Sequence, residues 1–320
     1  MQGTNGFIHW QTLGVIKEFM KFINSWKLQD ARLPFANSNG VFLAYRSYMY
    51  MVAGTNASNA SGIKDVWSAP IGTDGALGKW KLVGTIPIIH GFHTACIHEG
   101  TGRLYVFGGT QPQPKLWVAK LTGEGGCGVF VSVDQWLAAF NSSPGSVAIG
   151  DAIVIVEAAT GKVRLHQVDG QSKYVAPLPA IRSYFHVIAD KDNIYVIGGE
   201  DASTNKTATV FRAKVTNFDI PRWEILNTTL PVGLARHGVV NHNGNVLIVN
   251  GRLQSLANND NCYNVQIQPD GTMSAFTAEE RHPLAFRNAH QQTVIHNGYI
   301  YTLGGFDTTY SDKVFMSKLS

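Results

Sequence analysis

Short apolar runs that end in two small residues recur along the chain, with more polar stretches between them. Six runs share this form: 50–54, 105–109, 154–158, 195–199, 247–251 and 301–305. Their last residues follow one another at intervals of 55, 49, 41, 52 and 54 positions. A spacing near 50 is typical of four-stranded propeller blades. The pattern therefore predicts six repeated blades.

An aromatic residue followed by a proline keeps step with these runs. The interval between the two is seven or eight residues in five places: Trp26 and Pro34, Trp80 and Pro87, Trp136 and Pro144, Trp223 and Pro231, Phe276 and Pro283. A large aromatic side chain can seal the gap between blades, and proline is confined to strand edges and ends. We therefore expect each outer strand to end on the aromatic residue, and the proline to stop it before the chain crosses inward.

Each repeat divides into four strands joined by tight turns. Inner strands are expected over 92–97, 185–189 and 238–242, and the Asn-Gly pairs at 243–244 and 297–298 are typical of the hairpins that follow. The glycine-ended run is the second strand. Third strands are expected in four of the repeats, over 66–71, 116–120, 210–215 and 314–319.

The sequence ends at Ser320, directly after the third strand of the sixth repeat. We therefore expect this repeat to lack an outer strand of its own. Trp26 and Pro34 carry the outer-strand markers with no strands before them, so we expect an N-terminal strand to close the last blade. Closure removes the open sheet edge, which is otherwise an aggregation liability. The sequence thus predicts an all-β fold, a six-bladed propeller over residues 23–320.

Residues 1–22 precede this closing strand and form a separate N-terminal extension. Ile16, Phe19, Met20 and Ile23 follow the i, i+3, i+4, i+7 spacing of an amphipathic helix. Two roles fit such a helix: a plug packed on the propeller's own face, or a docking segment for a partner. Trp10 rivals Trp26 as the closing aromatic residue. The 28 residues from Trp26 to Gly54 favour Trp26, since Trp223 stands equally far before Gly251.

Composition narrows the class of protein further. Only 15% of the residues are charged and 44% are hydrophobic, whereas an average soluble domain has roughly 25% charged residues. The net charge of +4, with no Lys/Arg block, gives no reason to expect nucleic acid. The three cysteines are too few for a disulfide framework. We expect no signal peptide and no membrane span.

The strand ending in Gly-Gly with a tryptophan downstream resembles kelch-repeat β-propellers. The string from Val66 to Trp80 is similar, more narrowly, to kelch-like repeats of bacteriophage structural proteins. The resemblance implies a binding scaffold, such as a tail- or fibre-associated virion component. Two repeats depart from the pattern, because Glu157-Ala158 and Asn250-Gly251 replace Gly-Gly. We expect these two blades to be strained or specialised.

Signals for catalysis are weak. Residues 123–128 match G-x-G-x-x-G, but a β-like run follows where a dinucleotide site needs a helix. His90 and His93 are three residues apart, which sends their side chains to opposite faces of a strand. We therefore expect no metal and no cofactor.

Cationic and imidazole side chains recur 13 to 18 residues before the ends of the glycine runs. They are His93, Arg182, His186, Arg236, His237, Arg287 and His290, and Asn39 and Ser143 take the corresponding places in the first and third repeats. Inner strands line a propeller's central channel, so these residues are expected at one channel mouth. Such a ring favours an anionic or polyhydroxylated ligand through bidentate guanidinium contacts. Alternatively, the same residues hydrogen-bond the backbone of neighbouring blades.

Two classes of function follow. The first is a non-enzymatic virion module that binds other virion proteins or itself, and host surface glycan. The second is a channel enzyme of the sugar mutarotase or epimerase type, for which Glu157 and Glu200 are the candidate acid/base residues. An intracellular kelch adaptor in the cytoplasm is a weaker alternative, because we expect no oligomerisation domain beside the propeller in this sequence.

Overall fold

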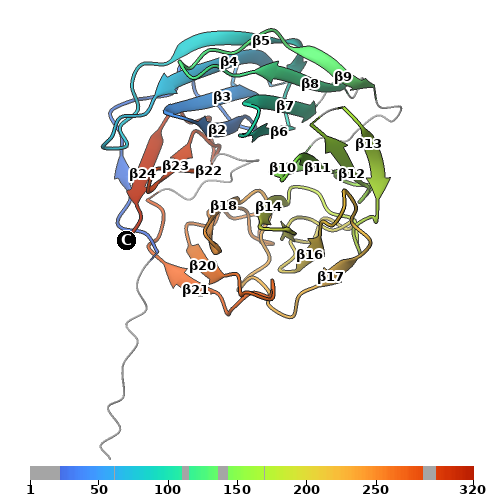
Figure 1. Cartoon of the computed structure of the whole chain (residues 1–320). Helices are drawn as coiled ribbons and strands as arrows, with labels where there is room; N and C mark the ends of the chain where they lie inside the picture. Colours follow the sequence, from blue (N-terminus) through green and yellow to red (C-terminus); the bar gives the residue numbers. More distant parts are fainter. Residues whose placement is uncertain (1–21, 61, 110–114, 136–142, 169, 284–292) are drawn as a thin grey trace, which may run out of the picture.

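The chain forms a six-bladed β-propeller in a computed structural model (Figure 1). The structure describes all residues except 1–21, 61, 110–114, 136–142, 169 and 284–292. Six antiparallel sheets of four strands surround a common axis. The described part of the chain contains no helix, and the helical pattern at 16–23 falls almost wholly outside it.

Within each blade the strands run in chain order from the axis to the rim, apart from the closing strand. The inner strands are β2 (Val41–Tyr45), β6 (His93–His98), β10 (Gly145–Ile149), β14 (His186–Asp190), β18 (Gly238–His242) and β22 (Thr293–His296). The second strands are β3 (Tyr48–Gly54), β7 (Arg103–Gly108), β11 (Ala152–Val156), β15 (Asn193–Ile197), β19 (Asn245–Val249) and β23 (Tyr299–Leu303). The third strands are β4 (Ile63–Pro70), β8 (Lys115–Lys120), β12 (Val163–Gln167), β16 (Val210–Lys214), β20 (Cys262–Gln266) and β24 (Val314–Lys318). The outer strands are β5 (Lys81–His90), β9 (Val131–Gln135), β13 (Ser172–Val175), β17 (Trp223–Ile225), β21 (Thr277–Glu279) and β1 (Lys27–Leu28).

The N-terminal strand closes the ring, as the sequence predicts. β1 pairs with β24 in antiparallel register, with Lys27 opposite Met316 and Leu28 opposite Phe315. Trp26, next to β1, is 8% exposed, and its ring centroid lies 4.8 Å from that of His282 in the fifth blade. This aromatic contact between two blades confirms the sealing role expected for Trp26.

The position of the outer strands differs from the prediction. In four blades the strand begins at or directly after the aromatic residue, as β17 does at Trp223 and β5 does after Trp80. The aromatic residue thus marks the start of the outer strand in these blades and not its end. β5 also continues through Pro87 to His90, which is tolerated because an outer strand has one edge without a neighbour.

The paired small residues at the ends of the second strands have a backbone cause. In five blades both residues have positive φ, for example 60° and 94° at Gly198 and Gly199, and 59° and 110° at Asn250 and Gly251. Asparagine tolerates this region, which explains the substitution in the fifth blade. Glu157 and Ala158 do not have positive φ, so the sequence departure in the third blade marks a real change of turn.

Gly198 shows why the first of the two residues is small. A Cβ there would lie 2.7 Å from the carbonyl oxygen of Leu234 and 2.9 Å from Cε1 of His237. Both neighbours belong to the segment that leads into the next blade. The glycine therefore gives the crossing chain room to pass.

Candidate functional site

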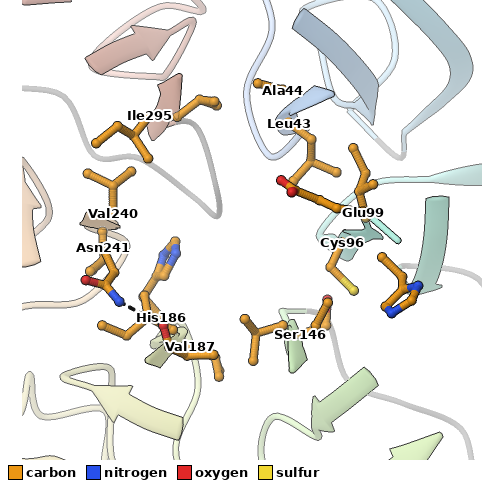
Figure 2. A pocket seen from close by; sticks show the side chains of 18 of the residues that line it. Leu43, Ala44, Cys96, Glu99, Ser146, His186, Val187, Val240, Asn241 and Ile295 are labelled. Carbon is orange, nitrogen blue, oxygen red and sulfur yellow. Dashed lines mark hydrogen bonds between the residues drawn. The ribbon is translucent and has the colours of Figure 1, made fainter. Parts of the chain in front are cut away.

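The six inner strands enclose a cavity of about 510 Å³ along the propeller axis (Figure 2). Most of its lining is aliphatic, including Leu43, Val240 and Ile295. Polar groups come from several blades: Ser146, His186, Asn241, Thr293, His98 and Glu99. Ligand sites commonly have this size and this mixture of apolar walls with a few polar groups.

Strand register separates the predicted histidines into two sets. His93 lies opposite Gly108, and the pairing of Gly238 with Val249 places His237 in the equivalent position. His186 lies opposite Ile197, one residue further along its strand, and it lines the cavity. His93 and His237 are only 0% and 2% exposed. Among the predicted residues that the structure describes, His186 alone faces the cavity.

His186 and His237 form a buried pair, with ring centroids 6.4 Å apart. Burial lowers the pKa of His186 to about 4. Burial, and then the proximity of His186, lowers the pKa of His237 to about 3. Both imidazoles are therefore neutral at pH 7 and contribute no positive charge to the cavity or its surroundings.

Arg182 is committed to the fold. Its guanidinium donates hydrogen bonds of 2.8 Å to the carbonyl oxygen of Ile181 and to Oγ1 of Thr209. It also lies 4.7 Å from the centroid of the Phe211 ring, and the residue is 5% exposed. These contacts hold Arg182 beside its own segment and the fourth blade, and the hydrogen bonds do not reach the backbone of a neighbouring blade.

Arg236 has a different environment. Its guanidinium carbon lies 3.5 Å from the centroid of the Tyr184 ring, and its Nε lies 3.8 Å from Oε1 of Glu200. The same Glu200 oxygen lies 3.1 Å from Nζ of Lys206. The Arg236 side chain remains 17% exposed, against 5% for Lys206. Of the two predicted arginines that the structure describes, Arg236 is the more accessible.

A residue one or two positions before the inner strand has positive φ in five blades. These residues are Asn39, Phe92, Ser143, Tyr184 and Arg236, here called the left-handed ring. Backbone hydrogen bonds connect it between blades: the N–H of Ser143 donates to Phe92 O at 2.8 Å, and that of Arg236 to Tyr184 O at 2.9 Å. Phe92 was expected only as the first residue of an inner strand, and Tyr184 was not among the predicted site residues. Tyr184 stands 15 residues before Gly199, as Asn39 does before Gly54, and asparagine tolerates positive φ, so this shared position was the available signal.

Three predicted groups lie outside the described residues or inside the core. Arg287 and His290 fall within 284–292, and Ile16, Phe19 and Met20 within 1–21, so their predicted roles stay predictions. Ile23 is fully buried and pairs with Leu319. It therefore contributes to the closing sheet.

The carboxylates considered for acid/base chemistry are engaged by neighbouring side chains. Glu157 accepts hydrogen bonds from Oγ1 of Thr160 at 2.9 Å and from Oη of Tyr174 at 3.2 Å. Burial raises the pKa of its carboxyl group, against these hydrogen bonds. Glu200 is paired with Lys206, and neither glutamate lines the cavity. The Cys96 thiol does line it, but burial raises its pKa to about 12, so it stays protonated.

Other features add little to the chemistry of the described residues. All three cysteines are free. Within the described ranges, three or more His, Cys, Asp or Glu side chains nowhere gather in a way that would hold a metal ion. A search of the same ranges finds no helix with the length and apolarity needed to cross a membrane.

Comparison with known proteins identifies no relative. No protein-family model matches the chain, and no curated protein matches it either. The fold and the side-chain geometry are therefore the basis for a functional assignment.

Proposed function

We propose that this chain is a non-enzymatic β-propeller that serves as a binding module, carried as a tail- or fibre-associated component of a phage virion. The observation that carries the proposal is the environment of Arg236. Its guanidinium is stacked on Tyr184 and partly exposed, two residues before the inner strand β18, whose residues 239–241 line the cavity. A guanidinium in this position favours an anionic or polyhydroxylated ligand, such as host surface glycan.

The virion assignment is supported by the string from Val66 to Trp80, which is similar to kelch-like repeats of phage structural proteins. A rigid ring of six blades also suits an assembly part, because a closed ring has fewer open sheet edges. Partners in this role are other virion proteins or a second copy of the chain.

The environment of the candidate acids favours binding over catalysis. Sugar epimerisation requires a positioned acid or base within hydrogen-bond reach of the substrate. Glu157 and Glu200 have their oxygens occupied by Tyr174, Thr160 and Lys206, away from the cavity. We therefore expect no interconversion of aldose anomers or epimers above the buffer rate when the purified protein is followed by proton NMR.

The decisive test is the location of the protein in a source culture. Mass spectrometry of density-gradient-purified particles is expected to find this chain together with tail and capsid proteins. Recovery only in the particle-free soluble fraction would overturn the virion assignment. Stable complexes with cellular proteins in that fraction would instead support the intracellular adaptor.

A further inference from the structure

The left-handed ring holds side chains that its backbone does not favour. The φ angles are 56° at Phe92, 54° at Tyr184 and 58° at Arg236. Asparagine and glycine adopt this region at the least cost, whereas bulky side chains are disfavoured there. The first blade makes the same turn with Asn39, at φ 55°. The turn itself therefore requires neither an aromatic ring nor an arginine, and strain of this kind clusters at binding sites.

Tyr184 and Arg236 act as one unit in this ring. The backbone N–H of Arg236 donates a hydrogen bond to the carbonyl oxygen of Tyr184. The Arg236 guanidinium carbon lies 3.5 Å from the centroid of the Tyr184 ring. Stacking restricts the rotamers of Arg236 before any ligand arrives. A fixed guanidinium loses less entropy on binding, so it is a better anion receptor than a freely rotating one.

The charges around Arg236 leave an excess of positive charge. Glu200 is closer to Lys206 than to Arg236, at 3.1 Å and 3.8 Å, and the Lys206 side chain is 5% exposed. One buried carboxylate thus faces two cations. The buried lysine satisfies the glutamate, and the more exposed arginine keeps hydrogen-bonding capacity for an external anion.

We propose that Tyr184 and Arg236 form a subsite for the carboxylate of an acidic sugar. This inference rests on the proposed binding function and names its ligand class. Bidentate pairing suits a carboxylate, and an amphipathic tyrosine ring suits contact with the apolar C–H groups of a sugar. Two residues after Tyr184, His186 lines the cavity.

The backbone supplies an unusual way to test the subsite. Arg236→Asn removes the guanidinium and places a residue that tolerates positive φ, so the fold is expected to keep or raise its melting temperature. Calorimetric titration would use a trisaccharide of galacturonic acid and, as the uncharged probe, a trisaccharide of galactose. We expect Arg236→Asn to weaken binding of the uronate about 10- to 100-fold, the range for charge-assisted hydrogen bonds, and to leave the neutral sugar unchanged. Arg222→Asn is the matched control, because the Arg222 side chain is 80% exposed on the outer strand side.

The outcomes separate a failure of the carboxylate subsite from a failure of the virion assignment. Uronate binding by Arg236→Asn at wild-type affinity would overturn the subsite, as would a wild-type protein that does not prefer the uronate. The virion assignment would still stand if the chain accompanies particles. If Arg236→Asn fails to fold, Arg236→Lys takes its place: it keeps the charge, loses the bidentate fork, and is expected to weaken uronate binding. Unchanged affinity in that variant would also overturn the subsite.

Discussion

The hydroxyl group of Tyr301 donates a 2.8 Å hydrogen bond to the carbonyl oxygen of Gly75, connecting the sixth blade to the first. In the fourth blade, the Tyr195 hydroxyl group donates an equivalent hydrogen bond, of 2.9 Å, to the carbonyl oxygen of Gly271 in the fifth blade. In both cases a second-strand tyrosine reaches the turn before the next blade's outer strand. The ring is therefore closed by a buried side-chain bond as well as by strand pairing.

Replacement of Tyr301 by phenylalanine is expected to lower the free energy of unfolding by about 1–2 kcal/mol, because it leaves the Gly75 carbonyl oxygen without this donor. Urea denaturation followed by tryptophan fluorescence measures the change. Tyr50→Phe is the matched comparison, since the Tyr50 hydroxyl lies 3.4 Å from its acceptor oxygens on Thr122 and Gly126. A loss for Tyr50→Phe as large as that for Tyr301→Phe would contradict the ranking by geometry.

Substitutions at the first of the two residues that end the second strands are expected to have opposite effects on stability in the fourth and fifth blades. Gly198→Ala is expected to cost more than about 2 kcal/mol, because it adds a Cβ within 2.7 Å of the Leu234 carbonyl oxygen at a positive φ. Asn250→Gly at the equivalent position is expected to be neutral or to stabilise by up to about 1 kcal/mol. The Asn250 side-chain amide is buried without a hydrogen-bond partner in the described structure. Thermal denaturation of both variants tests this, and equal effects would refute it.

Breaking the pair of Glu200 and Lys206 should destabilise the fourth blade strongly. Glu200→Gln leaves a lysine that is 5% exposed without its carboxylate, at an expected cost of about 3 kcal/mol. The double variant with Lys206→Met removes both charges and is expected to recover most of that loss. A double-mutant cycle in urea gives the coupling energy, and additive losses would show that the two side chains act independently.

Stability is expected to fall on acidification because of His186 and His237. Their pKa values are lowered by burial from 6.5 to about 4 and about 3. The unfolded chain therefore binds more protons than the native protein below about pH 6.5, and stability declines from there towards pH 3–4. One unit of pKa shift is worth about 1.4 kcal/mol. The shift of His186 alone therefore accounts for a loss in the free energy of unfolding on the order of 3 kcal/mol across this acid range.

Unfolding titrations between pH 7.5 and 4 measure this slope. His186→Gln cannot titrate, so it should flatten the dependence while changing stability little at pH 7.5. An unchanged slope in that variant would show that other groups control the acid response.

The repeat pattern was enough to predict the architecture, because each blade reuses the same backbone solution. Positive φ at Gly198 and Gly199, and the close passage of the next blade, impose small residues that are visible in sequence. Closure by β1 followed from counting strands. The outer strands were misplaced by a few residues because Trp26 and Trp80 precede strand pairing, and a sequence marker does not distinguish the two sides of a strand end.

The candidate site was predicted only in outline. Counting residues located the start of the inner strands, but a difference of one register position sends His186 to the cavity and His237 to a blade contact. Sequence also could not separate Arg182, tied to Thr209, from Arg236, stacked on Tyr184. These differences depend on side-chain neighbours that are distant in sequence, which no local pattern encodes.

The pairing of β1 with β24 also determines how the propeller would respond to pulling. Ile23 lies opposite Leu319, and the N–H of Asn24 donates to the Lys318 carbonyl oxygen at 2.9 Å, so the start of β1 and the end of β24 leave the same corner of one blade. Force applied between these two points would break the backbone pairs between β1 and β24 one after another. The same ring would resist tension applied across different blades, where many hydrogen bonds share the load. If the protein were held through both ends, the pairing of β1 with β24 would be the first part of the fold to break under load. If it were held through one end, this pairing would carry no load.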